Sequence, residues 1–210
     1  MNNKILLSFT GLLLSGLLYA QDVALVFKNM PQELIMTVDS VKRLDLMDLY
    51  NDGFPARVMN SFNDTVVLKE FTSDYLLLKT GQSVMEVALL PMINDSKIIC
   101  LINTVCAPVC DSRISFYTTE WKLLPMEVFF TPVESEWFVK EGVDKTGNDY
   151  QDLLSMLDMN LMMFHIEKNQ FELVQTFTTP DYLSKNEQNK VKSVLKSEPK
   201  VFSWNKTRFN

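Results

Sequence analysis

The stretch from Ala56 to Val133 constrains the fold more than any other, because its apolar residues recur at every second position. That period is typical of β-strands, and turn sequences such as Asn63-Asp64 and Gly81-Gln82 interrupt it at short intervals. Strands joined by such short turns pair as antiparallel hairpins. The pattern predicts a meander of strands over Arg57–Phe62, Val66–Phe71, Tyr75–Lys79, Val84–Leu90, Lys97–Val105, Arg113–Tyr117 and Glu127–Thr131.

Helical patterns flank this stretch on both sides. Asp22 can cap a helix over Val23–Lys28, and Ser40 can cap a longer helix that carries an apolar stripe. Near the C-terminus, Ser184 and Glu187 have the spacing of a capping box, which predicts a helix that begins there.

The segment between the meander and the last helix adds a loop, a helix and a hairpin. Glu134 to Asp149 is charged and predicts the loop, Tyr150–Leu157 the helix and Leu161–Phe177 the hairpin. The central strands are apolar on both faces, so helices are expected to cover one face. The sequence therefore predicts an α+β fold: a mainly antiparallel β-meander sheet, extended by the hairpin and packed by N-terminal and C-terminal helices.

The start of the chain has the pattern of a secretory signal peptide. Lys4 supplies a positive charge, Ile5–Leu18 is almost wholly apolar, and cleavage can follow Ala20. The apolar run is shorter than the roughly 20 residues that cross a bilayer, so no membrane span is expected. We expect a signal peptide over residues 1–20, a single α+β domain over residues 21–210, and a periplasmic or secreted protein.

The charge of the chain argues against one class of partner. Its formal net charge is −6 at pH 7. Nucleic-acid binding requires a basic face that neutralises phosphates, so no nucleic-acid partner is expected.

Three cysteines follow the expected cleavage point. Cys106 and Cys110 flank the short sequence Ala107-Pro108-Val109, and an oxidising compartment would allow them to form a loop disulfide. Two reduced thiols, or a redox or metal pair, are the alternatives. The chain has no second cysteine pair and no histidine cluster, so no metal is expected. Cys100 lies in an apolar run and is expected to be a buried, reduced side chain.

Candidates for binding or catalysis are few. Asp111, Ser112 and Arg113 group a carboxylate, a hydroxyl and a guanidinium after the cysteine loop, so they could bind a small polar ligand or shape the turn. His165 is the only histidine and lies in an apolar strand pattern, which favours a structural role. The acids of the charged loop could hold paired carboxylates for glycoside hydrolysis, but acids in a loop are usually solvated and nothing fixes their separation: Glu134, Glu136, Glu141, Asp144 and Asp149.

Several short motifs carry a resemblance to a known family. They include Leu89-Leu90-Pro91, Lys97-Ile98-Ile99-Cys100, Asn103-Thr104-Val105 and Cys110-Asp111-Ser112-Arg113-Ile114. With these motifs the chain resembles a domain-of-unknown-function family of exported proteins from gut-type Gram-negative bacteria. The resemblance covers most of the chain and implies a periplasmic or secreted protein, but it implies no activity, cofactor or catalytic residue.

Two classes of function remain open at this point. The first is an exported, non-catalytic binding or scaffolding module of the periplasm or cell envelope, whose partner would be an envelope protein or a glycan. The second is a hydrolase that acts on envelope or glycan material. The lack of any reactive constellation favours the first class, and no cofactor is expected.

Overall fold

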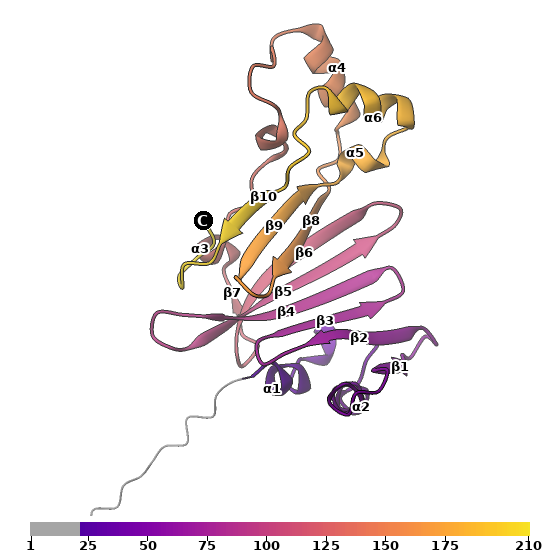
Figure 1. Ribbon diagram of the computed structural model, residues 1–210, viewed down its shortest axis with the longest axis vertical. Coiled ribbons are helices and arrows are strands. Elements are labelled where there is room, and N and C mark those ends of the chain that lie inside the picture. Colours follow the sequence, from indigo (N-terminus) through magenta and orange to yellow (C-terminus); the bar gives the residue numbers. More distant parts are fainter. Residues whose placement is uncertain (1–21) are drawn as a thin grey trace, which may run out of the picture.

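The computed structural model describes residues 22–210, and its centre is a seven-stranded antiparallel sheet (Figure 1). The expected signal peptide lies outside the described residues. The strands follow one another across the sheet in chain order, so the predicted meander and the α+β class are confirmed. They are β1 (Arg57–Met59), β2 (Thr65–Phe71), β3 (Tyr75–Thr80), β4 (Ser83–Pro91), β5 (Lys97–Cys106), β6 (Cys110–Thr118) and β7 (Leu123–Leu124).

N-terminal helices cover one face of this sheet (Figure 1). They are α1 (Val23–Lys28), the short 3₁₀ helix η1 (Gln32–Leu34) and α2 (Ser40–Asn51). The Asp22 carboxylate caps α1 as predicted, whereas Asp39, one residue before the expected Ser40, caps α2. An apolar core fills this interface, because side chains such as Phe27 and Leu46 are fully buried against the sheet.

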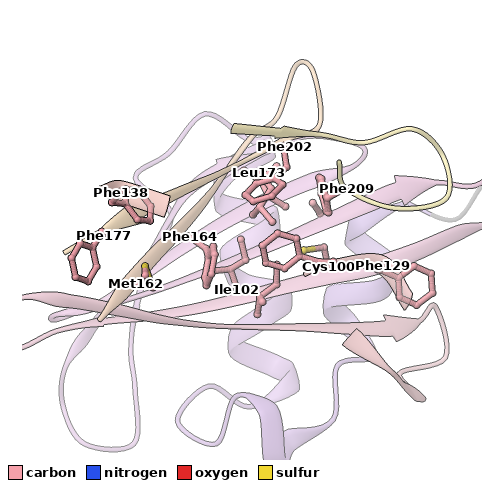
Figure 2. Close-up of a cluster of buried hydrophobic side chains, with 14 of the residues drawn as sticks. Cys100, Ile102, Phe129, Phe138, Met162, Phe164, Leu173, Phe177, Phe202 and Phe209 are labelled. Carbon is pink, nitrogen blue, oxygen red and sulfur yellow. The ribbon is translucent and has the colours of Figure 1, made fainter. Parts of the chain in front are cut away.

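A second, three-stranded sheet covers the opposite face (Figure 2). Its strand order is β10 (Lys200–Ser203), β9 (Glu172–Phe177) and β8 (Met162–Glu167). The prediction that this hairpin extends the large sheet is therefore wrong. Every second residue of β8 is apolar, and the hairpin buries that apolar face against Cys100 and Ile102 of β5 instead of adding to an edge.

The C-terminal helices lie beyond one end of the small sheet rather than over the large one (Figure 1). They are α4 (Asn148–Met156), α5 (Thr179–Tyr182) and α6 (Lys185–Lys192). The predicted capping box is present, because Ser184 and Glu187 bond reciprocally at the start of α6. Leu153 of α4 and Val191 of α6 lengthen the core that lies between the sheets.

The predicted strand over Glu127–Thr131 is wrong, since this segment holds the short helix α3 (Met126–Phe129). Pro125 precedes it, with the φ of −63° that suits a helix start. The turn also lets two consecutive residues, Phe129 and Phe130, both reach the core, which a strand would prevent by placing them on opposite faces. The 3₁₀ helix η2 (Ser135–Phe138) follows.

The first predicted strand is shorter than expected and ends at Met59 instead of Phe62. The Asn60 side-chain oxygen accepts hydrogen bonds from the peptide N–H groups of Phe62 and Asp64, at 2.8 and 2.9 Å. These bonds form a turn that competes with the strand.

Candidate functional site

A cleft of about 550 Å³ opens at the edge of β6. The described chain lines it with mostly apolar walls, and Arg113 is their one charged residue. The lining residues are Ser112, Arg113, Ile114, Ser115, Leu123, Leu124, Pro125, Met126, Pro132 and Phe164. β6, β7, α3 and β8 thus all contribute to one site.

The hydrogen-bond ladder leaves part of this β6 edge open. β7 pairs with β6 at only two positions. The peptide N–H of Thr118 donates to the carbonyl of Lys122 on the β7 side, at 2.9 Å. Alternate residues of an antiparallel strand direct their N–H and C=O groups to the same edge. Phe116, Ile114 and Ser112 therefore direct theirs to the β7 side as well.

The strand that would complete the ladder is cut short by a proline. Leu124 pairs with Phe116, and the next residue, Pro125, has no N–H with which to continue. The same register would place Met126 opposite Ile114, but Met126 already begins α3.

The other end of the open edge is closed by the small sheet. The Cys110 carbonyl points to the same side and accepts a hydrogen bond from Thr178 Oγ1 at 2.7 Å. Between the two ends, the described residues offer no strand partner to the backbone groups of Ser112 and Ile114.

The structure separates the roles of the three predicted binding residues. Asp111 Oδ1 and Ser112 Oγ accept hydrogen bonds from the peptide N–H groups of Met162 and Phe164, both at 3.0 Å. They therefore hold the small sheet. Arg113 is exposed and lines the cleft, so it is the member of the group whose charge remains available to a ligand.

A line of polar side chains from the large sheet accepts hydrogen bonds from β8. We name it the β8 seam and define it as Asp111 and Ser112 of β6 and Glu86 of β4. Their partners are the N–H groups of Met162, Phe164 and Ile166 respectively. These are the amides that β8, as the outer strand of its sheet, leaves without a strand partner. The seam therefore satisfies a buried sheet edge with side chains.

Glu86 is the centre of a second polar cluster. It is buried, and its Oε2 accepts hydrogen bonds from Tyr75 Oη at 2.8 Å and from the Ile166 N–H at 3.1 Å. His165 Nδ1 lies 3.0 Å from the same oxygen, while its Nε2 lies 3.7 Å from Glu167 Oε1. One carboxylate oxygen thus binds a phenol, an amide and an imidazole.

This arrangement shifts two pKa values. The hydrogen bond to Glu86 raises the pKa of His165 above its usual 6.5, against the opposing effect of partial burial. Burial, and then the charge of Glu86, raise the pKa of Tyr75, which stays a neutral phenol. A histidine between two carboxylates can hold a proton. Among the described residues, however, no hydroxyl or thiol is hydrogen-bonded to His165 as a nucleophile would be.

Sequence reasoning placed His165 in a strand but missed its partners. Glu86 carried a signal, because it is the one acid in the otherwise apolar sequence Val84-Met85-Glu86-Val87-Ala88, on the side that Ala88 shares. A charged residue on a buried strand face requires partners. Which partners it has depends on β8, about 80 residues later in the chain.

The described residues contain no group of three or more histidine, cysteine, aspartate or glutamate side chains that could hold a metal ion. A disulfide joins Cys106 and Cys110, which face each other at the end of the β5–β6 hairpin. Cys100 is a buried free thiol, and burial raises its pKa well above the usual value, so it is not a reactive thiolate. None of the helices over residues 22–210 is long and apolar enough to cross a membrane.

Fold and site together define an α+β domain in which two antiparallel sheets pack face to face beside an open strand edge. Comparison with known proteins adds a family. The family described as "Protein of unknown function (DUF3256)" matches residues 16–209, so the chain belongs to it.

A solved structure shows the same fold. It is described as a domain of an uncharacterized protein from Porphyromonas gingivalis W83, with a TM-score of 0.80 and 28% sequence identity over 88% of this chain and 96% of that one. No curated protein matches the chain. The descriptions of the family and of the solved structure name no activity.

Proposed function

We propose that this domain is a non-catalytic binding module of the periplasm or cell envelope, and that the cleft at the β6 edge is its ligand site. The observation that carries the proposal is the open edge itself. Backbone N–H and C=O groups at Ser112 and Ile114 border an apolar cleft and lack a strand partner among the described residues.

The composition of the cleft supports binding. Ligand sites are typically apolar hollows with a few polar groups that fix the orientation of the ligand. Here Leu124, Met126 and Phe164 supply apolar walls. The unpaired backbone groups of β6 and the Arg113 guanidinium supply the polar groups that can fix the orientation of a ligand. A ligand that displaces water from an unpaired backbone group stabilises the complex only if it forms a hydrogen bond with that group in place of the water.

The proposed compartment rests on two features of the chain. Residues 1–20 have the charge and apolar run of a secretory signal, and Cys106 and Cys110 are bonded as an oxidising compartment allows. An envelope protein or a glycan would then be the partner. Mass spectrometry of protein exported by the native host should give an N-terminus at Gln21, and soluble protein that still begins at Met1 would contradict export.

The alternative, a hydrolase, would have to use the cluster around His165. That imidazole donates toward the buried Glu86, and its other nitrogen faces Glu167 rather than a hydroxyl or thiol. The cluster also satisfies Tyr75 and the Ile166 amide, which gives it a structural task. We therefore place the ligand at the β6 cleft and not at His165.

The test is a ligand screen by amide NMR with peptides, envelope glycans and lipid headgroups as separate probe classes. A ligand of the module should shift the amides of Ser112–Ser115 and Leu123–Leu124 and be recovered unchanged. Leu123→Glu should abolish these shifts, because it places a charge on the apolar wall. Val128→Glu is the matched control, since both side chains are exposed but Val128 lies outside the cleft lining.

Two results would contradict the proposal. One is that no probe class shifts the cleft amides. The other is turnover of a probe that His165→Gln abolishes while the melting temperature is unchanged, which would show that the protein is an enzyme.

A further inference from the structure

We propose that the occupant of the β6 cleft is a short extended peptide segment, which adds to the open edge of β6 as a strand and directs acidic side chains to Arg113. The inference rests on the proposed function, because it requires the cleft to be the ligand site. It goes further by naming the chemical class of the ligand.

The unpaired backbone groups of β6 determine the chemical class of the ligand. Ser112 and Ile114 present their N–H and C=O groups in the spacing of a β-ladder, on the line along which β7 already pairs with Phe116. Only another polypeptide backbone repeats donor and acceptor at that spacing, about 3.3 Å per residue along a strand about 4.8 Å away. The occupant would continue β7 beyond Pro125, where the chain itself leaves the sheet. This is strand addition, a general mode of peptide recognition.

The two ends of the edge limit the length of the segment. Thr178 already binds the Cys110 carbonyl, and Leu124 already pairs with Phe116. The free part between them, residues 111–115, corresponds to about five extended residues, or roughly 16 Å. A longer strand would have to bend away at both ends.

The walls determine the side chains of the occupant. Successive residues of a strand point to opposite faces of the sheet. On one face the occupant meets Ile114, Met126 and Phe164, which suits an apolar residue. On the other face it meets the exposed Arg113, which makes no ion pair within the described residues and suits an acid. The expected sequence alternates apolar and acidic residues.

The probe that follows is the blocked peptide acetyl-Asp-Val-Asp-Val-Asp-amide, carrying a fluorophore for anisotropy measurements at physiological salt. Its control is the same peptide with Lys in place of Asp. Binding of the Asp peptide should shift the Ser112 and Ile114 amides and slow their hydrogen exchange. Arg113→Glu should weaken the Asp peptide about tenfold and favour the Lys peptide. Arg57→Glu, on β1 at the opposite edge of the sheet, is the matched control and should change neither preference.

Backbone methylation tests the ladder separately from the side chains. In an added strand, only every second N–H points to β6. Of two peptides, one N-methylated at the valines and the other at the aspartates, only one should therefore lose binding. If both methylated peptides bind, or if both fail, strand addition is wrong.

The remaining outcomes separate the inference from the proposed function. A glycan or lipid headgroup that shifts the cleft amides where the peptides do not would leave the binding module intact and overturn the peptide. Edge-to-edge pairing of two copies would appear as a dimer in sedimentation and would also overturn it. If no probe of any class shifts these amides, both proposals fail.

Discussion

The two faces of the large sheet are covered by different elements, and each cover is held by the polar groups that it needs. On the helical face, Arg43 Nη1 donates to the carbonyls of Phe27 and Met30, at 3.0 and 2.6 Å, and Trp121 Nε1 donates to the Val26 carbonyl at 3.0 Å. On the other face, Glu86, Asp111 and Ser112 accept from the amides of β8.

In each cover, polar side chains complement the backbone groups that the cover leaves unpaired: donors meet carbonyls at the end of α1, and acceptors meet amides of β8. The end of a helix leaves carbonyls unsatisfied, so donors meet α1. The edge of a sheet leaves both N–H and C=O groups without a strand partner, and at β8 three of these N–H groups meet side-chain acceptors. Both sets lie in otherwise apolar interfaces, where an unpaired polar group costs about 1–3 kcal/mol.

Removal of the central acceptor should have the largest effect. Glu86→Ala leaves the Tyr75 hydroxyl and the Ile166 amide buried without a partner, and should lower the free energy of unfolding by about 4 kcal/mol, as for the loss of one member of a buried pair. Urea unfolding measures it. Glu70→Ala is the control: Glu70 pairs with Lys168 at the surface and should cost far less. Equal losses would show that the seam adds nothing beyond surface charge.

Removal of the donor on the helical face should come second. Arg43→Met keeps the buried stem but leaves the Met30 carbonyl without its donor and the Phe27 carbonyl with backbone donors alone, so the free energy of unfolding should fall by about 2 kcal/mol. The loss is smaller than for Glu86 because the Arg43 Nε is itself buried without a partner, and its removal relieves a cost. Lys42→Met, one residue earlier and at the surface, should change the free energy by at most about 0.5 kcal/mol. A stabilised Arg43→Met protein would contradict this account.

Loss of the disulfide should have a moderate effect. The double change Cys106→Ser and Cys110→Ser opens a short loop at the hairpin end and should cost about 1–2 kcal/mol, since short loops lose little chain entropy on closure. Thiol counting on the oxidised, denatured protein should find one free thiol, that of Cys100. A count of three thiols would show that the bond does not form.

Protonation of His165 should have the smallest effect. Because Glu86 raises the pKa of His165 above 6.5, the stabilisation is fully present below about pH 6.5 and is lost as the pH rises through the folded-state value. The imidazole is 41% exposed, so the effect is about 0.5 kcal/mol after solvent screening. His165→Gln should remove this part of the pH dependence between pH 5.5 and 8.5. An unchanged profile would show that the pair does not contribute.

Several elements followed from local sequence, and the errors occurred where packing overrode it. The capping box at Ser184 and the helix after Asp22 need only neighbouring residues, and both are present. Glu127–Thr131 has the composition of a strand, yet the helical turn α3 and the extended Phe130 after it bring both Phe129 and Phe130 into the same core. The two strands of the hairpin were predicted correctly, but they pack on the face of the large sheet instead of at its edge. A period of two shows that a strand has an apolar face, but it does not show which surface that face contacts.

The candidate site was predicted in part. The sequence singled out Asp111, Ser112 and Arg113, but only the structure assigns the first two to β8 and leaves Arg113 in the cleft. The open edge could be suspected from Pro125, which ends β7. Only the register of β6 and β7 shows which backbone groups of that edge have no strand partner among the described residues.

Periodicity, turns and caps act over a few residues, so the sequence alone predicts most of the order of strands and helices, apart from β7 and α3. Which element covers each face, and which polar groups meet there, depends on the packing of the whole chain. Glu86 and Ile166 lie 80 residues apart, and no local pattern links them. A buried polar group must find a partner wherever the chain brings one, and that partner exists only once both sheets are packed.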